Sequence, residues 1–293
     1  MVKFLLSETC SVNGNTTDTQ SPLNVAASYG SLDIVKMLLS QPGADINHSN
    51  HTRFYETPLV SAARNSHHQV LAYLLDHGAS LDPDAIDYVA SKSETKIIEY
   101  LLSRGMDVNT TTSYANRSLL HLASKSSYET TELLLRKGAN VNIVDSFGKT
   151  SLFEATNKEI IRLLLIYGAD VNVVLPISIT TPLHFHSSAS LSIKRREIVE
   201  LLLHAGANMY IERVDGETPL HTAAKSGDLE LVQLFIVWGM APDIISSLTG
   251  ETPLHSACKN AGNLPVVKFI TSLGVNIVAK DESGRTPLHF AGK

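Results

Sequence analysis

Two kinds of helix alternate along this chain, and each has its own pattern of apolar and polar positions. One kind carries apolar residues at helical spacing, such as Ile34, Val35, Leu38 and Leu39, or Ile198, Val199, Leu202 and Leu203. That spacing predicts an amphipathic helix with one buried face. The other kind is rich in small residues, which let a helix approach its neighbours closely: Ala26-Ala27, Ala62-Ala63, Ala223-Ala224 and Ala257.

A recurring tetrad predicts where the small-residue helices begin. Thr218-Pro219-Leu220-His221 returns at Thr252 and again at Thr286, each time after 34 residues, so the chain contains an internal repeat. Thr can cap the free amides of a helix start, and Pro suits the first helical position. Upstream copies begin at Thr181, Thr150, Ser118, Thr57 and Ser21, with a degenerate copy at Asp84-Ala85-Ile86-Asp87.

Glycines predict where the amphipathic helices end. They stand before the stretches Gly43-Ala44-Asp45-Ile46-Asn47, Gly105 to Asn109, Gly138 to Asn142, Gly168 to Asn172 and Gly206 to Asn208. Glycine is the usual residue just after a helix C-cap. The polar stretch before the next tetrad often contains a turn, as in Asp145-Ser146-Phe147-Gly148 and Asp281-Glu282-Ser283-Gly284.

The order of helix, turn, helix, Gly-Ala-Asp-Val-Asn, hairpin and Thr-Pro-Leu-His resembles the ankyrin repeat over essentially the whole chain. The resemblance implies an all-α, curved ankyrin-repeat solenoid, in which helix-turn-helix units stack and hairpins project beside a concave groove. It also assigns the tetrad histidines to hydrogen bonds between adjacent repeats. Spacing alone predicts only an α-solenoid.

The tetrads divide the chain into repeats of unequal length. We expect repeats at 21–56, 57–83 (short), 84–117 (degenerate), 118–149, 150–180 (short), 181–217 (with an insertion), 218–251 and 252–285. The short step after Thr57 predicts a missing hairpin. Partial repeats are expected at 1–20, with the second helix only, and at 286–293, and these incomplete ends predict a fragment of a longer protein.

Composition and charge restrict the function further. Hydrophobic residues make up 43% and charged residues 18%, which predicts an ordered chain. A net charge of -5 argues against nucleic acid as a partner. With only two cysteines we expect a reducing compartment, the cytoplasm, with the nucleus as an alternative. The apolar run within Met1–Leu6 is too short for a signal peptide or a membrane span, so no membrane insertion is expected.

Three motifs that could indicate chemistry are better explained by the repeat. Gly148-Lys149-Thr150 has Ile143 where a phosphate-binding loop needs Gly. Histidine pairs such as His184 with His186, or His67 with His68, could suggest a metal site, but the tetrad histidines recur once per repeat on stacked helices about 8–10 Å apart, too far to share one metal ion. Repeated structural histidines also argue against a Ser-His-Asp triad. We therefore expect no enzyme activity, cofactor, metal or catalytic residue.

The resemblance implies that partners contact the hairpin tips and the inner face of the first helices. Counting from each tetrad, a basic stripe is expected in the groove at Arg64, Lys125, Lys225 and Lys259, with Lys92 and Lys158 one place later. We hypothesise that the stripe accepts an acidic or phosphorylated segment. The aromatic anchor candidates, which could equally pack against neighbouring repeats, are Phe54, Tyr55, Tyr114, Phe147, Tyr210 and Trp238.

Two further hypotheses concern modification and localisation. Asn47, Asn109 and Asn172 each follow an acidic residue at two positions and Leu at eight, which resembles the context of ankyrin-domain asparagine hydroxylation, although it is also the repeat consensus. Lys194-Arg195-Arg196 is either a localisation signal or anion patch, or the solvated end of an inserted loop.

Taken together, the sequence predicts a protein-interaction scaffold or adaptor of unknown partner and oligomeric state. Three alternatives concern a longer protein: a substrate-recognition arm of a ubiquitin ligase, the cytosolic arm of a membrane channel, or the repeat region of a toxin or secreted effector. An intrinsic enzyme is the rival class, and it predicts a concave site with perturbed titratable groups.

Overall fold

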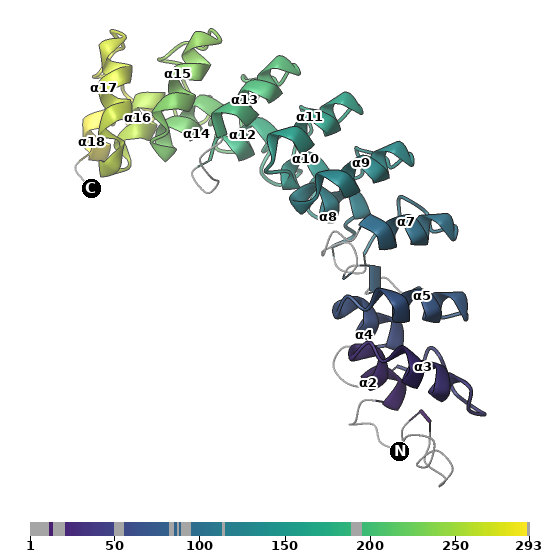
Figure 1. The fold of residues 1–293 in the computed structure, drawn as a ribbon. Helices are drawn as coiled ribbons and strands as arrows, with labels where there is room; N and C mark the ends of the chain where they lie inside the picture. Colours follow the sequence, from purple (N-terminus) through teal and green to yellow (C-terminus); the bar gives the residue numbers. More distant parts are fainter. Residues whose placement is uncertain are drawn as a thin grey trace. The chain divides into compact units, whose positions relative to one another are not determined.

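The computed structural model describes residues 12–13, 21–49, 56–81, 85–86, 88, 95–112, 115–188 and 195–291. The chain forms two compact units, one comprising residues 1–123 and 136–139, the other 124–135 and 140–293. Both are built from short helices (Figure 1). Within the ranges above, extended pairing is confined to one bridge between Thr111 and Ser118, so the fold class is all-α, as predicted.

The first unit consists of packed helix pairs. Here α2 (Pro22–Ser28) contacts α3 (Leu32–Leu39), and α4 (Pro58–Arg64) contacts α5 (His68–Asp76). The pairs stack because α2 also contacts α4, and α3 contacts α5. The helix α7 (Thr95–Ser103) follows. Residues of both units then contribute to α8 (Leu119–Ser126) and α9 (Tyr128–Arg136).

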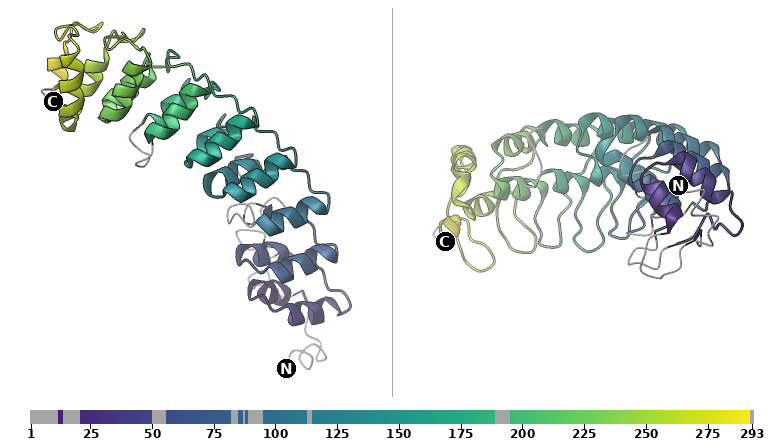
Figure 2. Two further views of the ribbon diagram at one scale, coloured as in Figure 1. Left: turned by 45° about the horizontal axis from the view of Figure 1, so that its top comes forward. Right: turned by 60° about the horizontal axis from the view of Figure 1, so that its bottom comes forward.

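The second unit repeats the same pairing in two rows (Figure 2). The row of first helices is α10 (Ser151–Glu154), α12 (Pro182–His186), α14 (Pro219–Ser226), α16 (Pro253–Cys258) and α18 (Pro287–Ala291). The row of second helices is α11 (Lys158–Ile166), α13 (Arg195–His204), α15 (Leu229–Val237) and α17 (Leu264–Ser272), the last preceded by a 3-10 turn at Ala261–Asn263. Neighbours within each row are in contact.

Each tetrad has two roles: its Thr and His cap the start of a first helix, and its Leu is buried between neighbouring helices. Thr181, Thr218 and Thr252 form capping boxes in which the tetrad histidine supplies the reciprocal side chain. The tetrad leucines Leu183 and Leu220 are fully buried. Burial of such a leucine contributes about 1.5–3 kcal/mol. The small residues that follow are also buried, which explains why neighbouring first helices can approach so closely.

The predicted helix ends are present as well. Gly168 and Gly206, which follow the last turns of α11 and α13, have φ values of 84° and 88°, a left-handed conformation that glycine adopts without strain. Some predictions lie outside the described residues: the N-terminal second helix near Val2–Leu6, the missing hairpin around 82–84, Asp84 and Asp87 of the degenerate tetrad, and the inserted loop 189–194.

Candidate functional site

Five loops of the second unit connect each second helix to the next first helix and project to one side of the helices (Figure 2). They cover residues 142–149, 172–180, 208–217, 241–251 and 276–285. In the first loop the Gly148 N–H donates to the Asp145 carbonyl at 2.9 Å, while the Asp145 carboxylate accepts the N–H groups of Phe147 and Lys149. Asp281 closes the last loop in the same way. Both predicted turns are therefore present.

Successive loops touch one another. The Val214 N–H donates to the Ser178 carbonyl at 3.2 Å, and the Ser246 hydroxyl donates to the Asp215 carbonyl at 3.3 Å. The Glu282 N–H donates to the Thr249 carbonyl at 3.0 Å. At the other end of the series, a β-carbon on Gly148 would collide with Pro176. The five loops consequently form one continuous stack.

Large apolar side chains are exposed at matching positions of three of these loops. Counted from the glycine that ends each second helix, positions six and nine are Val144 and Phe147, Val174 and Ile177, and Ile245 and Leu248. All six are exposed, with Phe147 at 56%, Ile177 at 92% and Leu248 at 62%. We call these six residues the apolar tip row. Exposed apolar groups that recur in register indicate a binding surface.

The third loop of the series, residues 208–217, differs. There, positions six and nine are Glu212 and Asp215. The Ser247 hydroxyl donates to the Glu212 carboxylate. Arg213 lies 3.7 Å from Asp215 and 3.9 Å from Glu217. An acidic step therefore interrupts the apolar tip row.

The expected basic stripe is largely neutralised within the chain. Lys225 Nζ lies 3.0 Å from Glu217, and Lys259 Nζ lies 2.6 Å from Glu251. In the first unit, Arg64 lies 3.2 Å from Glu56 and also donates to the Tyr88 hydroxyl. These three carboxylates are buried and need a charged partner. The cations therefore have a structural role, which weakens the charge argument for an acidic guest.

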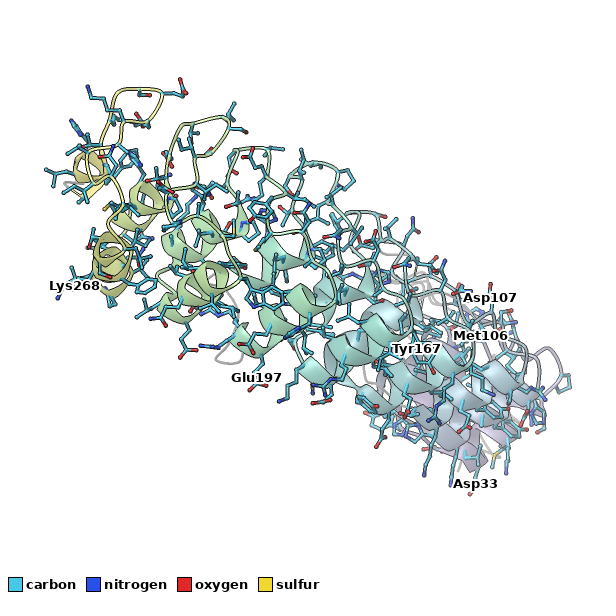
Figure 3. The ribbon with its side chains drawn as sticks, turned by 90° about the horizontal axis from the view of Figure 1, so that it is seen from above. Asp33, Met106, Asp107, Tyr167, Glu197 and Lys268 are labelled. Atoms are coloured by element: carbon cyan, nitrogen blue, oxygen red, sulfur yellow. The ribbon has the colours of Figure 1, made fainter. Side chains whose placement is uncertain are left out.

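The other stripe candidates have separate positions. Lys125 is exposed in the last turn of α8, and Lys92 lies outside the described residues. The expectation that Lys158 lies on a first helix is wrong: α10 ends at Glu154, and Lys158 is the first residue of α11. The deletion in this short repeat shifts Lys158 onto the second-helix row. There it pairs at 2.5 Å with Glu197, which Figure 3 labels. The hydrogen bond with Glu197 raises the pKa of Lys158.

The aromatic candidates fall into two groups. Phe147 and Tyr210 are exposed on the hairpin loops and remain candidates for partner contact. Trp238 instead packs against the neighbouring repeat, with its ring 5.0 Å from the His204 ring in an edge-on arrangement. Phe54, Tyr55 and Tyr114 lie outside the described residues.

Asparagines of the predicted hydroxylation motif connect adjacent repeats. The Asn172 amide donates to the Gly206 carbonyl at 3.1 Å and accepts the Asn208 N–H at 2.7 Å. Asn142 makes the equivalent pair with Gly168 and Asp170. Asn47 accepts the Ser80 N–H, and the Asn109 N–H donates to Asp107. Hydroxylation of Asn47, Asn109 and Asn172 stays a prediction, whereas the inter-repeat role was not foreseen.

The buried tetrad histidines connect adjacent repeats. The Thr218 N–H donates to His221 Nδ1, which leaves Nε2–H to donate to the Glu251 carbonyl at 3.0 Å. His184 and His255 make the same inter-repeat contact, as the family resemblance implied. Burial lowers the pKa of His184 and of His186 to about 4, and it also lowers the pKa of His221.

Other candidate sites have less support. Arg195 donates to the Ser188 carbonyl and lies 3.6 Å from Asp228, while Arg196 pairs with Glu200. These contacts favour the solvated loop end over an anion patch, and Lys194 lies outside the described residues. No cluster of three or more potential metal ligands occurs in the part of the chain that the structure describes. None of the helices listed above is long and apolar enough to cross a membrane.

Sequence reasoning missed the apolar tip row because it considered only aromatic anchors. The signal is nonetheless present in the sequence, as apolar residues six and nine positions after a helix-ending glycine. Single exposed isoleucines or leucines are common on protein surfaces. Because the loops stack, apolar residues that recur at these two positions lie along one surface.

Comparison with known proteins identifies the repeats. The sequence model of the family described as ankyrin repeats (3 copies) matches residues 1–50, 48–112, 88–174 and 183–281. The chain is 30% identical over 241 residues to "Ankyrin repeat and KH domain-containing protein mask-1" of Caenorhabditis elegans, covering 80% of this chain and 8% of that protein.

A human protein is similar to this chain both in sequence and in its solved structure. "Ankyrin repeat and SOCS box protein 11" of Homo sapiens is 33% identical over 101 residues, which cover 32% of this chain and 30% of that protein. The crystal structure of the human ASB11 ankyrin repeat domain aligns with a TM-score of 0.61 at 27% identity, covering 70% of this chain and 90% of that domain. The chain thus spans less than a third of the length of both curated relatives.

Proposed function

The chain belongs to the ankyrin-repeat family, and we propose that it is a protein-binding module, without catalytic activity of its own, whose main contact surface is the apolar tip row. Ankyrin repeats bind other proteins, and this part of the assignment follows from the family. The choice of surface depends on one observation: Phe147, Ile177 and Leu248 are exposed in register on stacked loops. A monomeric protein gains nothing in stability by exposing them.

A second exposed apolar surface is less suited to binding. Ile166 and Val237, at the ends of α11 and α15, are 72% and 83% exposed. The equivalent residue between them is the polar His204, and the residue that follows Ile166 in the chain is the exposed Tyr167, which Figure 3 labels. These residues do not form a continuous series, which makes them a matched control for the tip row.

The test compares capture of partners by the wild-type chain with capture by two charge variants. Phe147→Glu, Ile177→Glu and Leu248→Glu together should abolish capture of the specific partners from an extract of the source cells, as measured by quantitative mass spectrometry. Ile166→Glu with Val237→Glu should leave capture unchanged. If the control variant loses the same partners while the tip-row variant retains them, the proposed surface is wrong.

The acidic-partner hypothesis requires its own variant. Reversing the charge of Lys225 or Lys259 would place a second carboxylate beside buried Glu217 or Glu251, respectively, and would destabilise the fold. Lys125→Glu avoids this problem because Lys125 is exposed. An acidic or phosphorylated partner predicts weaker, less salt-dependent capture by this variant.

The role of the whole protein is a further proposal. A substrate-recognition arm of a ubiquitin ligase is the alternative with specific support, since "Ankyrin repeat and SOCS box protein 11" is among the relatives. The expected compartment remains the cytoplasm or the nucleus, on the argument from cysteine content. Co-purification of the full-length protein with ligase subunits would support the ligase alternative.

A further inference from the structure

We propose that the apolar tip row binds an extended segment of a partner protein in the polyproline-II conformation. Numbered along the bound segment of the partner, the side chains at positions one, four and ten are apolar, and the side chain at position seven is Arg or Lys. This inference rests on the proposed function and specifies the partner that the same surface recognises. It follows from the spacing of the loops, the acidic interruption and the rigidity of one loop.

The spacing of the loops sets the conformation of the guest. Stacked helices lie about 8–10 Å apart, and the loops that they carry are joined by direct hydrogen bonds, as between Ser178 and Val214. A polyproline-II segment has three residues per turn and rises about 9 Å per turn, so every third side chain lies on one face. A β-strand would place every third side chain on opposite faces. Of these two extended conformations, only polyproline II places one side chain of the segment against each loop.

The acidic interruption sets the charge pattern of the guest. Along the stack the loops present Phe147, then Ile177, then Glu212 with Asp215, then Leu248. Arg213 is the one cation within loop 208–217, and it is shared between Asp215 and Glu217. A cationic side chain on the third anchor would complement the remaining negative charge and fix the register of the guest. An acidic side chain there would be repelled.

The loop 172–180 is held in a strained but fixed shape. Its residues 172–180 include no charged side chain. The Leu175 N–H donates to the Thr180 carbonyl at 3.0 Å, and the Ile179 N–H donates to the Leu175 carbonyl at 2.9 Å. Ile179 has a φ of 50°, which is a genuine outlier for a β-branched residue. Such strain is retained where a loop must present a particular side chain, here Ile177.

The direct test uses synthetic peptides and the complete chain. The probe is fluorescein-labelled Leu-Pro-Pro-Leu-Pro-Pro-Arg-Pro-Pro-Leu, and binding is measured by fluorescence anisotropy. Since the segment can run in either direction, the peptide with Arg at position four and Leu at position seven is measured alongside. The better of these two should bind about tenfold more tightly than the peptide with Glu in place of that Arg. It should also bind more tightly than a peptide with Arg at position one and Leu at the other three anchors.

Matched variants of the protein attribute the effect to the tip row. Glu212→Lys with Asp215→Lys should reverse the preference between the Arg and Glu peptides, while Ile177→Glu should weaken both. Ile166→Glu, which lies outside the row, should change neither. Circular dichroism verifies that each variant is folded, as expected for changes at these surface positions.

Three outcomes would overturn the inference: equal binding of the Arg and Glu peptides, binding unaffected by Ile177→Glu, or Ile177-dependent sedimentation with phosphatidylcholine–phosphatidylserine vesicles in place of peptide binding. The last outcome would assign the row to a lipid surface. If capture of protein partners still requires the tip row but the peptides fail, the proposed function stands and the polyproline-II guest is wrong.

Discussion

His221 joins two repeats, because its Nε2–H donates to the carbonyl oxygen of Glu251 at 3.0 Å while its Nδ1 accepts the N–H of Thr218 in its own helix cap. One neutral imidazole thus completes a capping box and links to the next repeat. Its removal leaves a buried carbonyl and a buried amide without these partners. The stacking of the repeats, and with it the alignment of the loops, depends on such contacts.

Stability should fall as the pH falls from about 6.5 to about 4. His184 and His186 have folded-state pKa values lowered to about 4 from 6.5, so the unfolded chain binds more protons in this interval. Each histidine contributes a loss of up to about 1.4 kcal/mol per pH unit. Urea unfolding across this range measures the effect. The double variant His184→Gln, His186→Gln should have a flatter profile.

The exposed tetrad histidine His289 is the control for this prediction. His289→Gln makes the same substitution at an exposed ring. If His289→Gln flattens the profile as much as the double variant does, burial of His184 and His186 is not the cause.

Stacking of the loops can be tested with two glycines. Gly216 has a φ of 75°, and a β-carbon there would collide with the Ser246 hydroxyl and lie 2.8 Å from the Leu248 nitrogen. Gly168 has a similar φ of 84° but open space around it, with no atom within 4 Å of a β-carbon placed there. Gly168→Ala should therefore cost about 1–2 kcal/mol of backbone strain, and Gly216→Ala distinctly more. Equal losses in chemical denaturation would argue against close contact between the loops.

Replacing Ile179 by glycine should stabilise the chain. Ile179 has a φ of 50°, so Ile179→Gly relieves a left-handed strain of about 1–2 kcal/mol, less the entropy that glycine adds to the unfolded chain. Thermal unfolding should show a higher Tm. Ile177→Gly, two residues away and without this strain, should lower the Tm slightly. A fall of equal size in both variants would contradict the strained conformation.

Asn172 should contribute to stability through both of its inter-repeat hydrogen bonds. Asn172→Ala removes the contacts to Gly206 and Asn208 and should cost about 1–3 kcal/mol. Replacing the exposed neighbour Val174 by Ala should cost little by comparison.

Hydroxylation at Asn47, Asn109 or Asn172 is checked separately, by measuring the intact mass of the protein after exposure to an ankyrin-directed asparagine hydroxylase. A mass with no added oxygen would count against this modification.

The sequence was sufficient to predict the helices but not the surface. Tetrads such as Thr218 to His221 carry their own start signal, and glycines such as Gly168 carry the stop signal, because capping is a local property. The pairing of Lys225 with Glu217 was missed although the two are only eight residues apart. Their contact requires the loop to fold back on its helix, and no local pattern encodes that path.

Exposure was equally hard to foresee. Trp238 and Ile177 are both apolar residues near the ends of repeat segments, yet Trp238 packs on His204 while Ile177 is 92% exposed. The difference arises from contacts with neighbouring repeats. Lys158 is a further case, because a deletion of a few residues moved it from one row of helices to the other.

Site-specific photocrosslinking tests the central claim most directly. A photoreactive benzoylphenylalanine replaces Ile177 in one protein and Ile166 in the other, and both are irradiated in an extract of the source cells. The account predicts that a protein partner is crosslinked from position 177 and not from position 166. Crosslinking of the same partner from position 166, with none from position 177, would show that the hairpin loops are not the binding surface.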